Sequence, residues 1–412
     1  MRQLACLAGL AICLLVLLTT CSAPGRSARI SSFVAAPTAV LGPTVLPSVT
    51  PVPQVAGQFP TPALAVGQVA PPLAAVMSPA STGQIAPDLV ARAAQMDGYL
   101  ATLAQQSSFS GAVLVAYQGR VLLSRGYGMA NREQGLPASA TTRFRLASVS
   151  KPLTALGVLR LVAAGKLSLD ASICDYLDGC PPAWAPVRVA NLLSHTSGIA
   201  NFTDFAEFPN QEQQPATSAQ VVARFRDLPL GFTPSSLYQY TNSNYVLLGQ
   251  IIERVSGQSY PDYMRQELFA PLAMADTGYD PGDFGPLNGT HGYAGGVLDI
   301  PLNTSNLYAA GGLYSTVEDL LKLTQALDAG RILPADLAAR MVTPGEGRYG
   351  LGWMIEQRGA QRLVYHPGSM SGAATWLGSY PDAGVTVIVL SNDYYANVFA
   401  VADYLAAQLL PQ

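Results

Sequence analysis

The chain has 412 residues, of which 49% are hydrophobic and 12% are charged, and its formal net charge at pH 7 is −3. Because the charge is small and no basic cluster occurs, nucleic acid is not expected as a partner. No spacing of His, Cys and carboxylate residues is of the metal-ligand type, so we expect no metal and no other cofactor.

The N-terminal region has the features of an export signal. A basic residue precedes an apolar run over 4–18, which is too short to span a bilayer and predicts a signal peptide over 1–21. The end of this segment resembles a bacterial lipobox, although Thr20 stands where Gly, Ala or Ser is usual. We therefore expect an exported protein of the cell envelope with a lipid anchor at Cys21, and simple secretion is the alternative.

Residues 22–87 predict a disordered tether rich in Pro, Ala and Val. No charged residue occurs between positions 30 and 87, and the apolar residues follow neither a helical nor a strand period. Proline is also too frequent there for regular structure. The remaining segment, 88–412, is long enough for one domain with a large core.

The elements of this domain follow from hydrophobic periodicity and from Gly and Pro turn signals. In chain order, the main elements predicted are a helix at 88–104, an antiparallel hairpin at 111–116 and 120–127, a helix at 152–164, a helix opened by a capping box at 315–318, strands at 349–356, 362–366, 373–380 and 385–391, and a helix at 396–410.

Strands at both ends of the domain, with helices between them, predict an α+β fold. We expect one antiparallel sheet formed from both ends of the domain and flanked by helices. A mainly helical lobe, about residues 150–345, would be inserted between the two groups of strands.

Three short motifs occur in a fixed order: Ser148-Val149-Ser150-Lys151, Tyr240-Thr241-Asn242 and His366-Pro367-Gly368. Each motif alone is weak, but the order, the wide separation and the context of each strengthen the set. Together they supply a nucleophile, groups able to take its proton and an oxyanion cradle. These are the minimum components of acyl transfer through a covalent serine intermediate.

Ser148 is expected on the first turn of a helix, where Lys151, three residues further on, shares its face. A helix N-terminus offers N–H groups and a positive dipole end that suit an oxyanion. A lysine at its ordinary pKa is a poor base at neutral pH, although burial and neighbours can lower that pKa by about three units. Lys151 and Tyr240 are therefore expected to form a coupled pair, either member of which can be the base.

Five segments resemble the serine β-lactamases and penicillin-recognising enzymes, most closely the class C-like branch with D-alanyl-D-alanine carboxypeptidases, D-aminopeptidases and esterases. In the family's order they are 146–151 (LASVSK), 192–198 (LLSHTSG), 240–245 (YTNSNY) with 247–249 (LLG), 310–316 (AGGLYST) and 366–368 (HPG). The resemblance covers about residues 95–410. It implies the β-lactamase/transpeptidase-like fold and a serine hydrolase that acts on a peptide, ester or lactam carbonyl.

The resemblance also implies a role for each matching residue. The implied roles are Ser148 as acylated nucleophile, Lys151 and Tyr240 as proton-transfer pair, Asn242 as a contact to a substrate amide, the N–H groups of Ser148 and Ser369 as oxyanion hole, and the strand edge with His366 and Gly368 as a wall of the site.

The third motif departs from the family's pattern. In the β-lactamases proper it is usually Lys-Thr-Gly, whose ammonium and hydroxyl help to hold the β-lactam carboxylate, whereas this chain has His366 and Pro367. A neutral imidazole and a proline weaken that clamp, so we expect carboxypeptidase- or esterase-like activity more than efficient β-lactam hydrolysis. His366 is either a substrate contact, which its place in the motif favours, or a packed strand residue. His195 precedes a Thr-Ser-Gly turn and is expected to be structural.

Cys174 and Cys180 are the cysteines left for the domain once the signal peptide and Cys21 are set aside. They lie six residues apart in a chain predicted to be exported, with Asp178-Gly179 before the second Cys and two prolines after it. We expect them to form a disulfide, and two thiols are the alternative.

A non-catalytic cell-surface binding or sensor protein that keeps the fold is the alternative function. Retention of Ser148, Lys151 and Tyr240 together speaks against it. An α/β-hydrolase is disfavoured because no Gly-x-Ser-x-Gly elbow occurs. The partner that we expect is therefore a small-molecule or peptide substrate.

Overall fold

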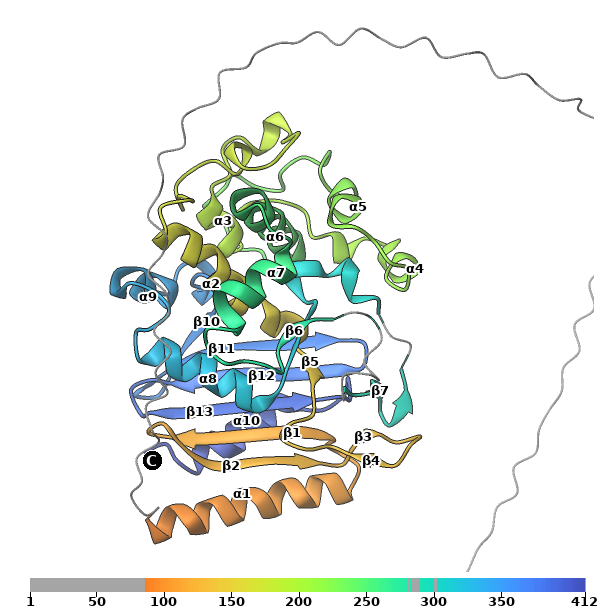
Figure 1. Ribbon diagram of the computed structural model, residues 1–412, viewed down its shortest axis with the longest axis vertical. Coiled ribbons are helices and arrows are strands. Elements are labelled where there is room, and N and C mark those ends of the chain that lie inside the picture. The colour runs from red at the N-terminus through yellow and green to blue at the C-terminus, as the bar shows by residue number, and fades with distance from the viewer. Residues whose placement is uncertain (1–85, 281, 283–288, 300–301, 412) are drawn as a thin grey trace, which may run out of the picture. The chain divides into compact units, whose positions relative to one another are not determined.

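The computed structural model of the chain describes residues 86–280, 282, 289–299 and 302–411 (Figure 1). The predicted signal peptide, Cys21 and the tether up to residue 85 lie outside the described residues. Within the described ranges, no helix is both long and apolar enough to cross a membrane.

A six-stranded antiparallel sheet is the centre of the domain (Figure 1). Its order is β10-β11-β12-β13-β1-β2, so the N-terminal hairpin adds to the C-terminal strands through β1 and β13. This confirms the prediction of one sheet formed from both ends of the domain. The strands are β1 (Gly111–Tyr117), β2 (Arg120–Tyr127), β10 (Met354–Arg358), β11 (Gln361–Met370), β12 (Ala373–Tyr380) and β13 (Val385–Ser391).

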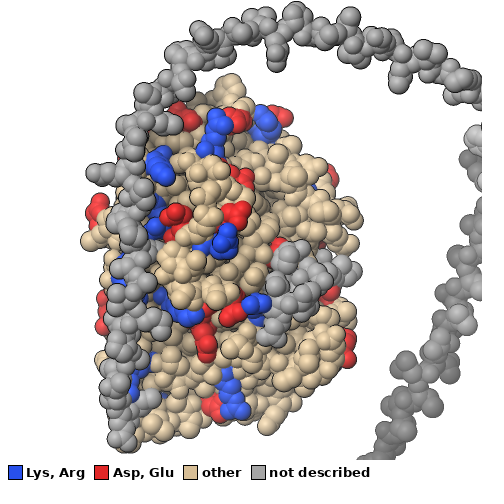
Figure 2. Space-filling model, in the orientation of Figure 1, with Lys and Arg blue, Asp and Glu red and all other residues tan. Residues whose placement is uncertain are grey.

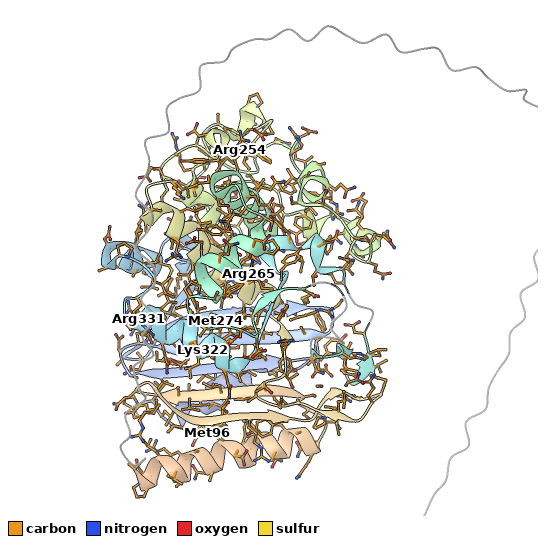
Figure 3. The ribbon with its side chains drawn as sticks, in the orientation of Figure 1. Met96, Arg254, Arg265, Met274, Lys322 and Arg331 are labelled. Atoms are coloured by element: carbon orange, nitrogen blue, oxygen red, sulfur yellow. A yellow bond between two sulfur atoms is a disulfide. The ribbon has the colours of Figure 1, made fainter. Side chains whose placement is uncertain are left out.

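The outer face of the sheet is covered by α1 (Pro87–Gln105) and α10 (Val398–Ala407), the first and last helices of the domain. Met96 on α1, labelled in Figure 3, is fully buried in this layer. Alternate residues of β1 enter the two cores: Val113 and Val115 belong to the outer one, whereas Leu114 faces the inner one. Because both faces are buried, the strand is apolar along its whole length.

The inner face carries the helical lobe, which confirms that a mainly helical lobe is inserted between the two groups of strands (Figure 1). Its central helix is α2 (Ser150–Ala163), which is buried nearly all round. Most of its residues are apolar, and the buried polar ones include Lys151 and Thr154. The other helices are α3 (Val189–Leu193), α4 (Phe208–Gln211), α5 (Ser218–Ala223), α6 (Asn242–Ser256), α7 (Tyr260–Met264), α8 (Val317–Asp328) and α9 (Ala335–Met341).

Short strands join the lobe to the sheet region. A three-stranded antiparallel sheet has the order β5-β9-β6, and its pairing brings Arg145, just before the nucleophile motif, opposite Tyr314. The short strands are β3 (Met129–Asn131), β4 (Leu136–Pro137), β5 (Phe144–Arg145), β6 (Gly278–Tyr279), β7 (Tyr293–Ala294), β8 (Val297–Leu298) and β9 (Leu313–Ser315).

Two local predictions need correction. The strand expected from residue 349 starts only at Met354, because Gly352 has φ +91° and lies so close to α2 that a Cβ there would be 2.5 Å from the Ala155 Cβ. The N-cap of α8 is Thr316 rather than Ser315, since the Thr316 side chain accepts the N–H of Asp319. Ser315 ends β9 instead.

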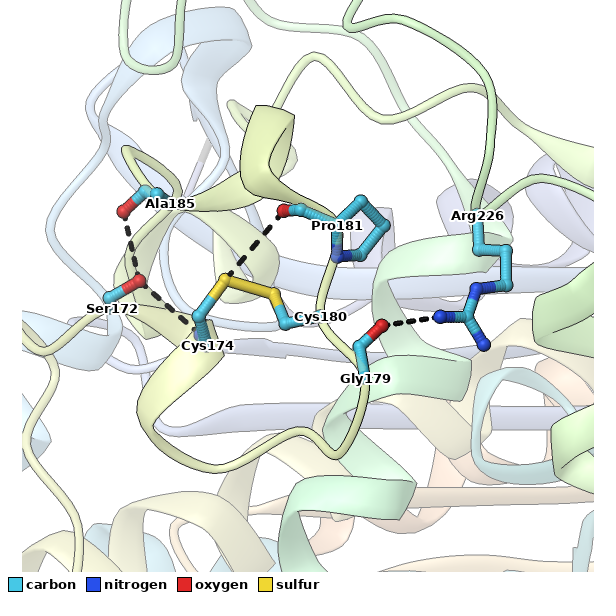
Figure 4. Close-up of a disulfide and its surroundings, with 7 residues drawn as sticks. All are labelled: Ser172, Cys174, Gly179, Cys180, Pro181, Ala185 and Arg226. Atoms are coloured by element: carbon cyan, nitrogen blue, oxygen red, sulfur yellow. Dashed lines mark hydrogen bonds between the residues drawn. A yellow bond between two sulfur atoms is a disulfide. The ribbon is translucent and has the colours of Figure 1, made fainter.

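The predicted disulfide between Cys174 and Cys180 is confirmed, with 5.2 Å between the two Cα atoms (Figure 4). Ser172 caps the short 3-10 turn that begins the loop, because its hydroxyl accepts the N–H of Cys174. Arg226 donates a hydrogen bond to the Gly179 carbonyl at the tip of the same loop. The bridge thus closes a small loop at the surface of the lobe.

Charged side chains are scattered over the face of the molecule that Figure 2 shows. Lysine and arginine lie among aspartate and glutamate there, and neither sign forms a broad patch. This mixed surface on the visible face agrees with the small net charge of the chain.

Candidate active site

Ser148 lies on a short 3-10 turn, Ala147–Val149, that precedes α2. The sequence predicted Ser148 on the first turn of the α-helix itself, and the structure places it on the turn just before that helix. The turn is fixed to its neighbours by two hydrogen bonds: the Leu146 N–H donates to Leu313 O (2.8 Å), and the Thr375 hydroxyl donates to Leu146 O (2.8 Å). Ala147 has φ +48°, a left-handed conformation that residues with a side chain rarely adopt.

Gly368 allows β11 to approach this turn closely. A Cβ at position 368 would lie 2.5 Å from Leu146 O and 3.0 Å from the Ser148 nitrogen, so only glycine fits. Ser369 is the next residue of the strand and is exposed. The structure thus brings the strand edge predicted to bound the site against the nucleophile turn.

Lys151 is completely buried and has three polar contacts. Its Nζ lies 3.1 Å from Ser148 Oγ, 2.8 Å from Asn242 Oδ1 and 2.9 Å from Ala310 O. Within the part of the chain that the structure describes, no carboxylate pairs with this amine. Burial therefore lowers the pKa of Lys151 well below its usual value, which favours the neutral amine.

Tyr240 is the other member of the predicted pair, and its ring centre is 4.8 Å from Lys151 Nζ. Burial raises the pKa of Tyr240 well above its usual value, although the neighbouring Ser148 hydroxyl acts in the opposite direction. The two members of the predicted pair thus differ: burial favours a neutral amine at Lys151 and a protonated phenol at Tyr240.

Asn242 begins α6, and its carboxamide is held on both sides. Oδ1 accepts the hydrogen bond from Lys151, and Nδ2 donates to Thr203 Oγ1 (3.0 Å). Its main-chain N–H donates to Asn201 Oδ1 (2.9 Å). The structure gives Asn242 a contact to the buried lysine, and the contact to a substrate amide stays a prediction. Asn201 and Thr203 were missed because they belong to no motif.

His366 is packed inside the protein, with 1% of its surface exposed. Its Nδ1 lies 2.7 Å from Pro367 O, which can only accept, so the proton is on Nδ1. Nε2 then accepts the hydroxyl hydrogen of Tyr349 at 3.0 Å. Burial is the main reason that the pKa of His366 is lowered to about 3, and the nearby Lys151 is the second. Of the two alternatives, the structure therefore favours the packed strand residue over the substrate contact.

Two further groups were not assigned to the site from the sequence. Tyr349 bonds to His366, and nothing near it in the sequence marks it. His195, expected to be structural, is fully buried, and its ring centre is 4.4 Å from that of Tyr240. Ala310, whose carbonyl accepts from Lys151, lies in one of the five segments that carried the resemblance.

The assembled groups have the chemistry of acyl transfer: a hydroxyl 3.1 Å from a buried amine, with a buried phenol against that amine and a strand edge beside the nucleophile turn. Among the described residues, no group of three or more His, Cys, Asp or Glu side chains is placed to hold a metal ion.

Comparisons with known proteins agree with this geometry. Residues 92–411 match the Beta-lactamase family. Esterase EstB of Burkholderia gladioli is 29% identical over 374 residues, which cover 75% of this chain and 92% of the esterase.

Two solved structures have the same fold. A penicillin binding protein from Bacillus halodurans has a TM-score of 0.67 and 28% identity, and the match covers 75% of this chain and 98% of that one. D-amino acid amidase from Ochrobactrum anthropi SV3, complexed with L-phenylalanine amide, has a TM-score of 0.68 and 25% identity, with 77% and 98% of the chains covered.

Proposed function

The chain belongs to the β-lactamase family and is a serine hydrolase, and from this membership and the site geometry we propose that it forms an acyl-enzyme at Ser148 with a peptide, ester or lactam carbonyl. Neutral esters and amides are the preferred donors, so that the activity is esterase- or amidase-like more than that of an efficient β-lactamase. The observation that carries the proposal is the buried Lys151 amine, 3.1 Å from Ser148 Oγ.

Lys151 is the general base in this mechanism. A neutral primary amine has two N–H groups and one lone pair. The contacts to Asn242 Oδ1 and Ala310 O use the two N–H groups, which leaves the lone pair for the proton of Ser148. As Ser148 Oγ attacks the carbonyl carbon, its proton passes to Nζ, and Lys151 becomes an ammonium.

Tyr240 is the general acid. The oxyanion of the tetrahedral intermediate accepts hydrogen bonds from the N–H groups of Ser148 and Ser369. When the intermediate collapses, the leaving group takes the proton of the Tyr240 hydroxyl, and the Lys151 ammonium returns a proton to the Tyr240 oxygen. Both groups are then neutral again. Water attacks the acyl-enzyme with the same pair in reversed roles.

The preference for neutral substrates follows from His366. With a pKa lowered to about 3, this imidazole carries no charge at neutral pH, and it is buried against Tyr349. A charge-assisted hydrogen bond to a carboxylate is worth about 1.5 to 3 kcal/mol, and position 366 supplies none. Penicillins, which carry a carboxylate, lose this contribution, whereas neutral esters and amides do not need it.

The N-terminal features support export as part of the same proposal. A signal peptide over 1–21 and a lipid at Cys21 would place the domain outside the cytoplasm on a membrane anchor, and the catalytic domain would follow a tether. Mass spectrometry of the N-terminal peptide of the mature protein tests the anchor. Secretion without the anchor is the outcome if that peptide carries no diacylglycerol.

The enzymatic proposal is tested with the purified chain and its Ser148→Ala variant. Both are incubated briefly with a fluorophosphonate, neutral p-nitrophenyl esters, D-amino acid amides and penicillins, and the adducts are located by mass spectrometry. We expect an adduct on Ser148, faster acylation by neutral esters and amides than by penicillins, and a loss of about 10⁴-fold or more in Ser148→Ala. An adduct on another residue would falsify the mechanism. If no probe labels the wild type, the non-catalytic binding protein becomes the better interpretation.

A further inference from the structure

We propose that His195 is a positioning residue for Tyr240, which it fixes through three contacts to Tyr240 and its two neighbours in the chain. His195 O accepts the N–H of Gln239 (2.9 Å), and His195 Nδ1 accepts the N–H of Thr241 (3.3 Å). The imidazole also lies against the Tyr240 ring, with 4.4 Å between ring centres. One residue therefore fixes the main chain on both sides of Tyr240 and one face of its ring. The inference rests on the proposed function of the site.

The backbone of His195 has an uncommon conformation that makes these three contacts possible. Its φ is +58°, in the left-handed region, where Asn, Asp and His are the best tolerated residues with a side chain. The neighbouring Thr196 holds the conformation in place: its N–H donates to Asn191 O (2.9 Å), and its carbonyl accepts from Ser235 N (2.8 Å). Backbone strain that the surroundings maintain in this way is concentrated at functional sites.

The His195 ring can accept the N–H of Thr241 only while Nδ1 carries no proton. Nδ1 accepts a main-chain N–H, so the proton of the neutral ring is on Nε2. Nε2 is buried and has no hydrogen-bond partner among the described side chains. Burial lowers the pKa of His195 well below its usual value, and Lys151 and His366 act in the same direction. The other rings facing it belong to Tyr238, Tyr245 and Tyr349.

Core packing alone does not account for this histidine. A hydrophobic side chain would fill the space without leaving a buried N–H unpaired. His195 does two further things: its Nδ1 accepts the N–H of Thr241, and its main-chain carbonyl accepts the N–H of Gln239. Both contacts act on Tyr240, the group that gives its proton to the leaving group.

If His195 positions Tyr240, its loss should change how the rate depends on the leaving group. The loss of a merely structural residue should not change that dependence. A poor leaving group needs a proton in the transition state, whereas an activated leaving group departs without one. Misplacing the phenol should therefore slow the hydrolysis of alkyl esters far more than that of p-nitrophenyl esters. A general loss of folded protein slows both equally.

The test compares His195→Asn with His195→Phe on alkyl, phenyl and p-nitrophenyl esters of one acyl group. Asn keeps an acceptor near the position of Nδ1 and tolerates a positive φ, whereas Phe keeps the ring and loses the acceptor. We expect His195→Phe to lose about 100-fold in kcat/KM on the alkyl ester and tenfold or less on the p-nitrophenyl ester. His195→Asn should stay within about fivefold of wild type on both. Tyr240→Phe should reproduce the leaving-group dependence of His195→Phe.

The matched control is Phe225→Leu, a substitution of a buried ring in the same lobe that touches neither Tyr240 nor Ser148. It should lower stability without changing the ratio of the two rates. Equal losses of His195→Phe on all three esters, or equal losses of the Asn and Phe variants, would overturn the proposal. If His195→Phe does not fold, the leaving-group ratio of His195→Ala decides in its place.

Labelling separates this inference from the function on which it rests. A fluorophosphonate should modify Ser148 in wild type and in both His195 variants. If wild type is not labelled, both proposals fail together. If wild type is labelled and turns over while the variants keep its leaving-group ratio, only the positioning role is wrong.

Discussion

The two faces of the sheet are built for different tasks. On the outer face, α1 and α10 cover the strands with fully buried apolar side chains such as Met96 and Leu405. On the inner face, the core also contains a buried lysine and two buried histidines. The outer layer therefore stabilises the fold by burying apolar side chains. The inner layer also buries polar groups, which reduce stability unless they are paired.

The backbone around the site is also held in uncommon conformations. Three residues with a side chain and a positive φ adjoin the site: Ala147 precedes Ser148, His195 contacts Tyr240, and Tyr308 comes two residues before the Ala310 carbonyl. Such conformations cost about 1 to 3 kcal/mol each. The outer face must therefore supply the stability that the inner face loses to its buried polar groups and strained backbone.

The largest expected effect is on the inner face. Lys151→Ala and Tyr240→Phe should each lower kcat/KM by about 10² to 10⁴, because the two side chains act as one proton-transfer unit. The double variant should be little worse than the poorer single variant. Steady-state kinetics with a neutral alkyl ester, whose leaving group needs a proton, measures all three. Losses that multiply in full would mean that the two groups act independently.

The next prediction compares one buried leucine from each face. Leu405→Ala on α10 and Leu153→Ala on α2 should each lower the free energy of unfolding by about 2 to 5 kcal/mol, because both side chains are fully buried. Only Leu153→Ala, two residues from Lys151, should also lower kcat, by about tenfold or more. Urea unfolding and kinetics on the same samples measure both effects. An equal loss of kcat in Leu405→Ala would erase the distinction between the faces.

Removing the disulfide tests whether a surface loop of the lobe affects catalysis at the site. Replacing Cys174 and Cys180 together by Ser should lower the free energy of unfolding by at most about 2 to 3 kcal/mol, because the loop that the bridge closes is short. Turnover should not change. Denaturant unfolding beside a kinetic assay provides the measurement, and a drop in kcat would show that the loop supports the site.

A smaller effect concerns the dependence of stability on pH. The unfolded chain binds the Lys151 proton up to a pKa of about 10.4, whereas burial lowers the pKa in the folded state. The unfolded state thus binds more protons between these two pKa values, so stability rises with pH there, by at most about 1.4 kcal/mol per pH unit. Between about pH 7.5 and about pH 9, wild type should gain stability relative to Lys151→Met. Parallel curves for the two proteins would mean that Lys151 is an ammonium in the folded state.

The smallest expected effect is at His366. Its pKa is lowered to about 3, so the imidazole remains neutral at higher pH. The ratio of penicillin to neutral-ester acylation rates should therefore not change between about pH 5 and about pH 8 on account of this residue. Stopped-flow acylation across that range measures the ratio. A ratio that falls through about pH 6.5 would indicate that His366 is exposed and titrates normally.

The sequence predicted the regular parts of the molecule best. The helix at 88–104 and the hairpin at 111–127 agree with α1, β1 and β2 to within one residue at each end, because their patterns are local. The close approach of Lys151 to Ser148 was likewise expected from residue spacing. The 3-10 turn at Ala147 was not predicted, and the sequence could not decide between the two alternatives for His366, because each depends on contacts between distant segments.

The close contact at Gly368 has a consequence for enzyme engineering. Any side chain there would push β11 away from the nucleophile turn, so this position cannot be randomised. Its neighbours differ, because Pro367 is half-buried and Ser369 is exposed. A library that varies 367 and 369 around a constant glycine would therefore search new substrate preferences while preserving the frame that holds the reacting serine.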